Sequence, residues 1–137
     1  IIGKGNPDKK RLIKAAYNAT LAGISAAKAG GRMGDIGEAI DSMAAKYGCK
    51  VFENFVGHGI GRDLHEEPMV LHKGKRNTGI PLVPGMVFTI EPILSLGSTK
   101  IKTLSDGWSV VTLDNSLTAQ FEHTIAIFSS RTDILTN

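Results

Sequence analysis

The first half of the chain repeats apolar residues at the three- to four-residue spacing of an α-helix. Asn6 suits the position before a helix and Pro7 suits its first residue, so the pattern predicts a helix that begins at Pro7. The glycine pair at residues 30–31 is expected to end that helix. A second apolar stripe predicts a helix over residues 35–47, which Gly48 would stop.

After residue 48 the spacing changes to short apolar runs between turn residues, which is typical of β-strands. We predict strands over residues 50–56, 68–72, 86–94, 98–104, 108–113 and 121–128, with a hairpin turn at residues 105–107. Two helices followed by several strands, without a regular alternation of the two, predict an α+β fold with a mostly antiparallel sheet.

Two of these strands each place a glutamate on the same face as a threonine. In the first, Thr89 and Glu91 share a face; in the second, Glu122 and Thr124 share one. A glutamate in an apolar strand needs a partner, because an unpaired buried carboxylate is very costly. Two interpretations follow for Glu91: it pairs with a buried lysine or arginine, or it binds a metal ion.

The stretch GHGIGRDLHEEP, residues 57–68, places two histidines among three glycines. His58 ends a predicted strand, and its glycine neighbours leave room for close approach. It is either a hydrogen-bonded turn residue or the nitrogen ligand of a metal. Imidazole together with carboxylates suits a hard or borderline divalent metal. Glu66 and Glu67 are expected to be solvated, and His72 is interpreted as a surface residue.

Composition narrows the class of protein. The chain has 137 residues, 42% hydrophobic and 21% charged, as in a soluble globular protein. Its aromatic residues Phe88 and Trp108 are expected in the core rather than in a pocket. The net charge is only +3, and the basic residues near the N-terminus alternate with apolar ones, as on a solvated helix face. A nucleic-acid or ribosome-binding element is therefore not favoured for Lys9, Lys10, Arg11 and Lys14.

The single cysteine, Cys49, excludes a disulfide within the chain. No apolar run approaches the roughly 20 residues that span a bilayer, and no signal-like segment opens the chain. We therefore expect a cytoplasmic protein without a membrane partner. Because the sequence begins at Ile1 without methionine, we also expect a processed product or a fragment.

Several segments together resemble, in order, the C-terminal half of type I methionine aminopeptidases. They are GHGIGRDLHEEP, PLVPGMVFTIEPIL, DGWSVVTLDNSLTAQFEHTI and DILT, preceded by DIGEAIDSMAAKYGCKVFENFVGHGIG. The resemblance begins near Pro7 and covers nearly the whole chain. It implies one half of the pita-bread fold, in which two pseudo-symmetric α+β halves surround a two-metal site. Residues 1–137 are then expected to form a single partial catalytic domain.

The resemblance also implies an activity, because the family removes the initiator methionine from new proteins. It implies that His58, Glu91 and Glu122 bind two divalent metal ions, with Glu122 bridging both. Co, Mn, Fe and Zn are not distinguished. Water activated by the metals would attack the scissile carbonyl. His65 would hydrogen-bond that carbonyl or the tetrahedral intermediate, and Glu91 would also help to move the proton.

Two further residues are expected near the methionine side chain of the substrate. The resemblance implies that Trp108 helps to wall the pocket for this side chain. Leu64 stands where the family commonly has a phenylalanine, which makes that wall smaller.

The chain departs from the family pattern in its metal ligands. The family's two aspartate ligands and a third catalytic histidine belong to the N-terminal half, and none of the seven aspartates here occupies a matching place. We therefore expect reduced or single-metal binding, no activity of this chain alone, and completion of the site by a missing N-terminal half or a homo-oligomer. The alternative is an inactive truncated module of the same fold that binds metal or protein.

The nearest rival within the fold is the group of Xaa-Pro peptidases and prolidases. They also carry a GHG…HE segment and a PGM-F-T-EP strand, but their second glutamate is usually followed by an acid in an R-x-E-D context. Here the second glutamate, Glu122, lies in QFEHT after DGW. That context favours a methionine aminopeptidase.

Overall fold

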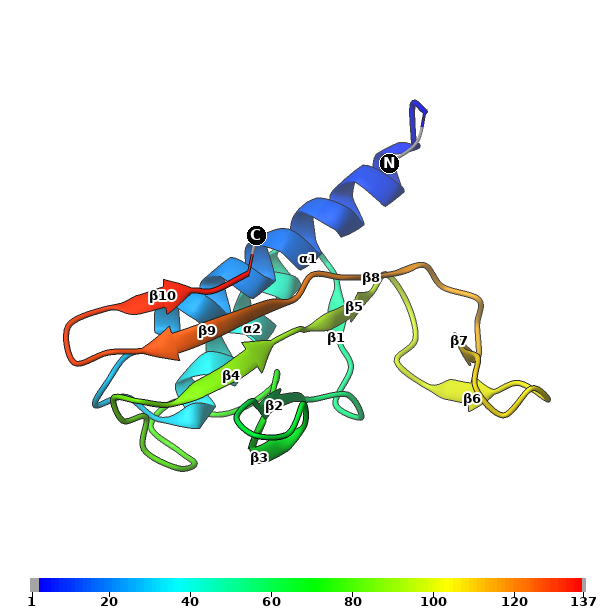
Figure 1. Ribbon diagram of the computed structural model, residues 1–137. Helices are drawn as coiled ribbons and strands as arrows, with labels where there is room; N and C mark the ends of the chain where they lie inside the picture. Colours follow the sequence, from blue (N-terminus) through cyan, green and yellow to red (C-terminus); the bar gives the residue numbers. More distant parts are fainter. Residues whose placement is uncertain (1–2, 137) are drawn as a thin grey trace.

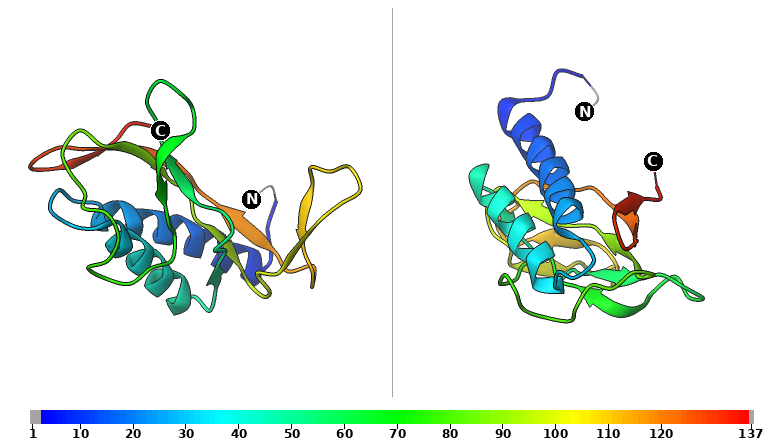
Figure 2. Two further views of the ribbon diagram at one scale, coloured as in Figure 1. Left: turned by 90° about the horizontal axis from the view of Figure 1, so that it is seen from below. Right: turned by 90° about the vertical axis from the view of Figure 1, so that its left-hand side faces the viewer.

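Two packed helices form one layer of the structure, a computed structural model that describes residues 3–136. The helices α1 (Pro7–Ala26) and α2 (Met33–Lys46) lie side by side across one face of the sheets (Figures 1 and 2). The two-helix prediction is confirmed, and the Asn6 side chain caps α1 by accepting a hydrogen bond from the Lys9 N–H at 2.8 Å. α1 ends before the glycines at residues 30–31, and α2 begins slightly earlier than predicted.

Within residues 3–136, ten short strands form three antiparallel sheets. They are β1 (Lys50–Val51), β2 (Gly57–Gly59), β3 (Glu66–Val70), β4 (Val87–Ile90), β5 (Ile93–Ser95), β6 (Ile101–Thr103), β7 (Val110–Thr112), β8 (Thr118–Gln120), β9 (His123–Ile127) and β10 (Thr132–Ile134). The largest sheet has the order β10-β9-β4-β2-β3, the second β1-β5-β8, and β6 pairs with β7 alone. Every pairing between these strands is antiparallel, as predicted.

The long strands predicted for the second half are shorter in the structure, and two are interrupted beside a glutamate. Residues 86–94 divide into β4 and β5 around Glu91 and Pro92, and β9 begins only after Glu122. β4 pairs with β9 in the largest sheet, whereas β5 pairs with β8 in the second sheet. Both glutamates therefore lie where the chain passes from one sheet to the other.

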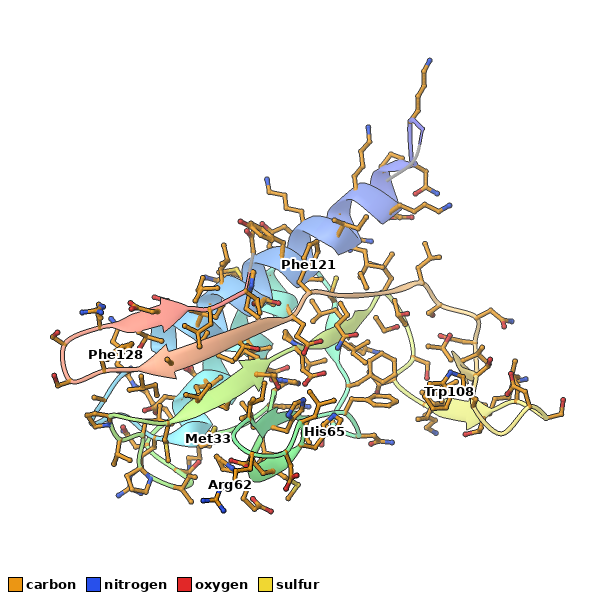
Figure 3. All side chains as sticks on the ribbon, viewed as in Figure 1. Met33, Arg62, His65, Trp108, Phe121 and Phe128 are labelled. Atoms are coloured by element: carbon orange, nitrogen blue, oxygen red, sulfur yellow. The ribbon has the colours of Figure 1, made fainter. Side chains whose placement is uncertain are left out.

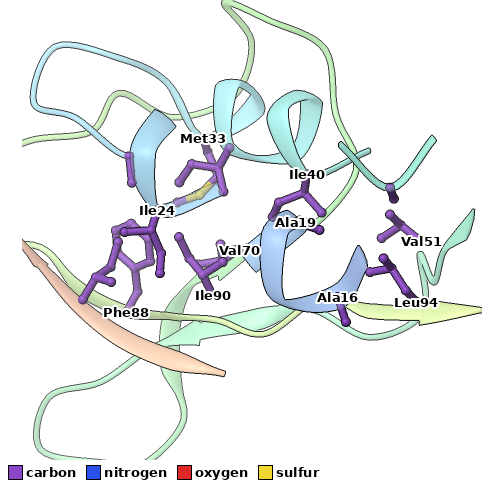
Figure 4. Packing of buried hydrophobic residues seen from close by; sticks show 14 of the residues in the cluster. Ala16, Ala19, Ile24, Met33, Ile40, Val51, Val70, Phe88, Ile90 and Leu94 are labelled. Atoms are coloured by element: carbon purple, nitrogen blue, oxygen red, sulfur yellow. The ribbon is translucent and has the colours of Figure 1, made fainter. Parts of the chain in front are cut away.

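Apolar side chains of the helices, the largest sheet and the second sheet form the core, the last including Val51 and Leu94 (Figure 4). Ile36 and Ile40 of α2 pack in one cluster with Phe88 and Ile90 of β4, and all four are fully buried. The core position predicted for Phe88 is thus confirmed. Because side chains alternate along a strand, Thr89 and Glu91 face away from this core.

The hairpin of β6 and β7 projects from the body of the structure (Figures 1 and 2). Its predicted turn is confirmed: Gly107 has a φ of 70°, and the Asp106 carboxylate accepts hydrogen bonds from the main-chain N–H groups of Trp108 and Ser109. The core position predicted for Trp108 is wrong, since this side chain is 87% exposed. A two-stranded hairpin that leaves the body has no layer to cover it.

Candidate metal centre

The two glutamates meet at the place where the strands change sheets. Thr89 faces Thr124 and Ile90 faces His123 in the β4–β9 register, so the next pair along is Glu91 with Glu122. β2 lies on the other side of β4 and brings His58 to the same place. Ligand atoms of His58, Glu91 and Glu122 all lie within 4.8 Å of one another. Residues separated by more than sixty positions thus form one cluster.

His58 and Glu91 are connected through a buried hydroxyl. The Thr89 Oγ1 accepts a hydrogen bond from the His58 N–H at 3.0 Å and donates to Glu91 Oε1 at 2.8 Å. Thr89 is only 1% exposed. The same carboxylate oxygen lies 3.5 Å from His58 Nε2. One threonine therefore fixes the main chain of the histidine and the side chain of the glutamate.

The glycines beside His58 allow β2 to approach its neighbours. A Cβ on Gly57 would collide with the Thr89 carbonyl, and a Cβ on Gly59 would collide with the Glu67 carbonyl. His58 Nδ1 lies 3.0 Å from the Gly59 carbonyl. Since a carbonyl only accepts, Nδ1 carries a proton, and in the neutral ring the lone pair is then on Nε2, the nitrogen that faces Glu91. This tautomer is the one that metal-binding histidines usually adopt.

The environment of Glu91 disfavours its charged form. Burial raises the pKa of its carboxyl above the usual 4.5, the hydrogen bond from Thr89 opposes that change, and the nearby Glu122 carboxylate raises the pKa further. Gln120 Nε2 contacts the second carboxylate oxygen at 3.2 Å. A cation placed between the two carboxylates would relieve their mutual repulsion.

His72 is part of this site, and its interpretation as a surface residue is wrong. The side chain is 2% exposed, and its Nε2 accepts a hydrogen bond from the Glu91 N–H at 3.1 Å. Burial lowers the pKa of His72 to about 4, so the ring is neutral near pH 7. A signal was available in the sequence: continued alternation from Val70 puts residue 72 on the buried face.

The other predicted site residues lie in two exposed segments (Figure 3). His65 belongs to the loop between β2 and β3, with its ring centroid 4.2 Å from that of His58. Leu64, beside it, is 70% exposed, and Trp108 lies on the projecting hairpin. Glu66 and Glu67 are exposed, as predicted. The structure therefore brings His65 to the cluster but does not enclose Leu64 or Trp108 in a pocket formed by residues 3–136.

A cavity that the sequence did not indicate opens between the body and the projecting hairpin. Its volume is about 480 Å³, and its lining includes Phe52, Phe55, Ile93, Ile101, Val111 and Thr118. Ile93 follows closely after Glu91, and Thr118 belongs to β8, which leads to Glu122. The lining also includes the polar residues Thr112, Asn115 and Ser116, so the cavity has both apolar and polar walls.

The donor set fits a divalent metal ion. One imidazole nitrogen and two carboxylates converge, the histidine tautomer leaves Nε2 free, and Thr89 and Gln120 orient the Glu91 carboxylate. Such a mixed nitrogen and oxygen set suits hard or borderline cations. The fold and this cluster together define a metal-binding α+β protein.

Comparison with known proteins agrees with this class. The chain matches the model of metallopeptidase family M24 over residues 1–128. It is 43% identical over 136 residues to methionine aminopeptidase B of Synechocystis sp., covering 99% of this chain and 50% of that protein. The chain therefore belongs to metallopeptidase family M24, a family that binds divalent metal, and it spans about half the length of the curated relatives it matches.

Solved structures give the same result. Methionine aminopeptidase from Rickettsia prowazekii has a TM-score of 0.95 at 42% identity, covering 98% of this chain and 55% of that one. The enzyme from Thermotoga maritima has a TM-score of 0.96 at 37% identity, covering 100% of this chain and 55% of that one. The predicted resemblance and the α+β half of a pita-bread fold are thus confirmed.

The rival group shares the architecture. Prolidase from Pyrococcus furiosus has a TM-score of 0.71 at 21% identity, which shows a common fold alone.

Within residues 3–136, neither helix is long and apolar enough to cross a membrane.

Proposed function

We propose that this chain supplies the C-terminal half of the catalytic domain of a methionine aminopeptidase, which removes the N-terminal methionine from nascent proteins. The observation that carries the proposal is the convergence of His58, Glu91 and Glu122 in a chain whose relatives are named methionine aminopeptidases. Peptide and nascent-protein N-termini are the proposed substrates. The lone, buried Cys49 accords with the cytoplasm as the proposed compartment.

The metal ligands on this chain are His58, Glu91 and Glu122 in the proposal. When bound, divalent metal ions lower the pKa of water and polarise a carbonyl group. The complete site would hold two ions, with Glu122 as the ligand that would serve both, and reduced or single-metal binding is proposed for this chain alone. The ion is one of Co, Mn, Fe or Zn, since the donor set suits each of these.

Two side chains are assigned to the reacting groups. His65 lies in an exposed loop beside His58, where its ring reaches solvent-accessible space and donates a hydrogen bond to the substrate carbonyl or the tetrahedral intermediate. Glu91 is assigned proton transfer at Oε2, the carboxylate oxygen that Thr89 does not contact. The Gln120 amide contacts Oε2, and this contact orients the oxygen for proton transfer.

The substrate side chain is assigned to the space around the projecting hairpin. The cavity of about 480 Å³ beside that hairpin has apolar walls, including Phe52, Phe55 and Ile93, that suit a methionine side chain, together with polar ones such as Asn115. Trp108 and Leu64 are proposed as outer walls, with Leu64 providing a smaller surface than an aromatic residue. Both need a further covering layer, since they are 87% and 70% exposed.

That layer is proposed to be the N-terminal half present in the longer relatives, or a second copy of this chain. Large apolar side chains are exposed on the loop and hairpin segments, and β3 and β10 are the outer strands of the largest sheet. The isolated chain is therefore expected to self-associate. Analytical ultracentrifugation tests this expectation, and a stable monomer at low concentration would contradict it.

A chimera tests the activity. This chain would replace the matching segment of the Rickettsia prowazekii enzyme, to which it is similar over 98% of its length. We expect the chimera to release methionine from a peptide beginning Met-Ala when a divalent metal is added. Its Glu122→Gln variant, matched in size, is expected to keep the fold and lose the release.

Other outcomes would assign a different function. A chimera that folds by circular dichroism and binds metal, but releases no methionine, would contradict the proposal and favour the inactive metal- or protein-binding module. Cleavage of an Xaa-Pro peptide in place of the Met-Ala peptide would favour the Xaa-Pro peptidase and prolidase group.

A further inference from the structure

Glu91 lies outside the hydrogen-bonding ladder of the sheet. β4 ends at Ile90, and β5 begins at Ile93. The two main-chain polar groups of Glu91 are bonded by side chains instead. Its N–H donates to His72 Nε2 at 3.1 Å, and its carbonyl accepts from Gln120 Nε2 at 3.1 Å. Side chains therefore replace a neighbouring strand at the central carboxylate of the cluster.

His72 makes this contact from inside the protein. A ring nitrogen that accepts from an N–H is unprotonated, so the proton of the neutral ring is on Nδ1. Within residues 3–136, His72 Nδ1 forms no hydrogen bond of normal geometry, although the Phe55 main chain lies near it. A buried polar atom without a partner destabilises a fold. The ring thus holds Glu91 through Nε2, whereas the main-chain partner near its other nitrogen is Phe55.

Holding the main chain of Glu91 in place determines the direction in which its side chain leaves the backbone. The peptide on the N-terminal side of its Cα is held by His72, and the carbonyl on the other side is held by Gln120. Pro92 follows and restricts Glu91 to extended backbone. These constraints fix the direction of the Cα–Cβ bond. Thr89 then only has to orient the end of the side chain.

We propose that His72 is a positioning residue for Glu91. By accepting the Glu91 N–H, His72 Nε2 holds the main chain so that the carboxylate reaches its place beside His58 and Glu122. This inference rests on the proposed metal-binding function of that cluster. His72 itself touches neither metal nor substrate in this role; it acts through Glu91.

The hydrogen bond can be observed directly in the metal-free chain. In a ¹⁵N-labelled sample, the N–H···N bond should produce a scalar coupling between the Glu91 amide nitrogen and His72 Nε2. The His72 nitrogen shifts should also place the proton on Nδ1. An absent coupling, or a proton on Nε2, would overturn the proposal whatever the chain does with metals.

A matched pair of variants tests the consequence for the metal. His72→Gln places an amide oxygen near the position of Nε2, whereas the shorter His72→Asn places it near the position of Nδ1. Calorimetric titration with Mn²⁺ is expected to give near-wild-type affinity for the glutamine variant and about 10- to 100-fold weaker binding for the asparagine variant. Equal affinities in the two variants would overturn the proposal, since both bury the same chemical group.

Two controls separate this inference from the proposed function. If the wild-type chain binds Mn²⁺ no more tightly than Glu122→Gln, the metal-binding function fails and this inference fails with it. If wild type binds more tightly than Glu122→Gln but both His72 variants match wild type, this inference alone fails. Should His72→Asn not fold, weak Mn²⁺ binding by a folded His72→Gln chain would likewise overturn it.

Discussion

Replacing Thr89 with valine removes a hydroxyl group and keeps nearly the same volume. The His58 N–H then loses its acceptor at 3.0 Å, and Glu91 Oε1 loses its donor at 2.8 Å. A buried donor left without a partner costs about 1–3 kcal/mol, and a hydrogen bond to a charged group contributes about 1.5–3 kcal/mol. Because Gln120 still contacts Glu91, we expect Thr89→Val to lower the free energy of unfolding by about 2–4 kcal/mol.

The control for this variant is Thr89→Ser, which keeps the hydroxyl and removes one methyl group. Its expected loss is about 1 kcal/mol, the transfer free energy of a buried methyl-sized group. Urea unfolding of the metal-free chain, followed by circular dichroism, compares the two. Metal titration should distinguish the two variants as well, because Thr89→Val should bind a divalent metal about 10- to 100-fold more weakly than Thr89→Ser. If valine is no more destabilising than serine, the hydroxyl does not connect His58 and Glu91 as described.

Three further predictions concern the same site. The pKa of His72 is lowered from 6.5 to about 4, so as the pH falls the unfolded chain binds a proton before the folded chain does. The free energy of unfolding should therefore decrease by up to about 3 kcal/mol between pH 6.5 and pH 4. Urea unfolding over this pH range measures the decrease, which should be smaller in His72→Gln. Glu122→Gln removes a negative charge beside Glu91 and should lower the pKa of Glu91 toward its ordinary value, but not below it, because burial still raises this pKa. A ¹³C NMR titration measures the change, and an unchanged pKa would contradict the proximity of Glu122 to Glu91. Gly59→Ala forces a Cβ against the Glu67 carbonyl and should lower the free energy of unfolding by about 1–3 kcal/mol, and a neutral result in urea unfolding would show that β2 and β3 lie farther apart.

Local patterns in the sequence were sufficient to predict the faces of the two glutamate-bearing strands. Side chains alternate along a strand with a period of two residues, so Thr89 with Glu91 and Glu122 with Thr124 could be paired without tertiary information. The observed register places these pairs opposite each other. The helix start at Pro7 was predictable for the same reason, since capping depends on neighbouring residues alone.

Features that depend on distant contacts were not predicted. The burial of His72 had a local signal in the alternation from Val70, but its partner is a main-chain N–H nineteen positions along the chain, which no local pattern indicates. Trp108 is exposed because its hairpin leaves the body, which hydrophobicity alone does not reveal. The interruption of residues 86–94 did have a local signal, because Pro92 lacks the N–H that a continuous central strand needs.

The central claim is that His58, Glu91 and Glu122 form one half of a metal centre, and calorimetric titration of the chain with Co²⁺ near pH 7 tests it most directly. We predict saturable binding at one site per chain for the wild type. In the Glu122→Ala variant, binding should be at least about tenfold weaker while the helical circular dichroism signal is retained. Wild-type binding no tighter than that of the variant would contradict the claim.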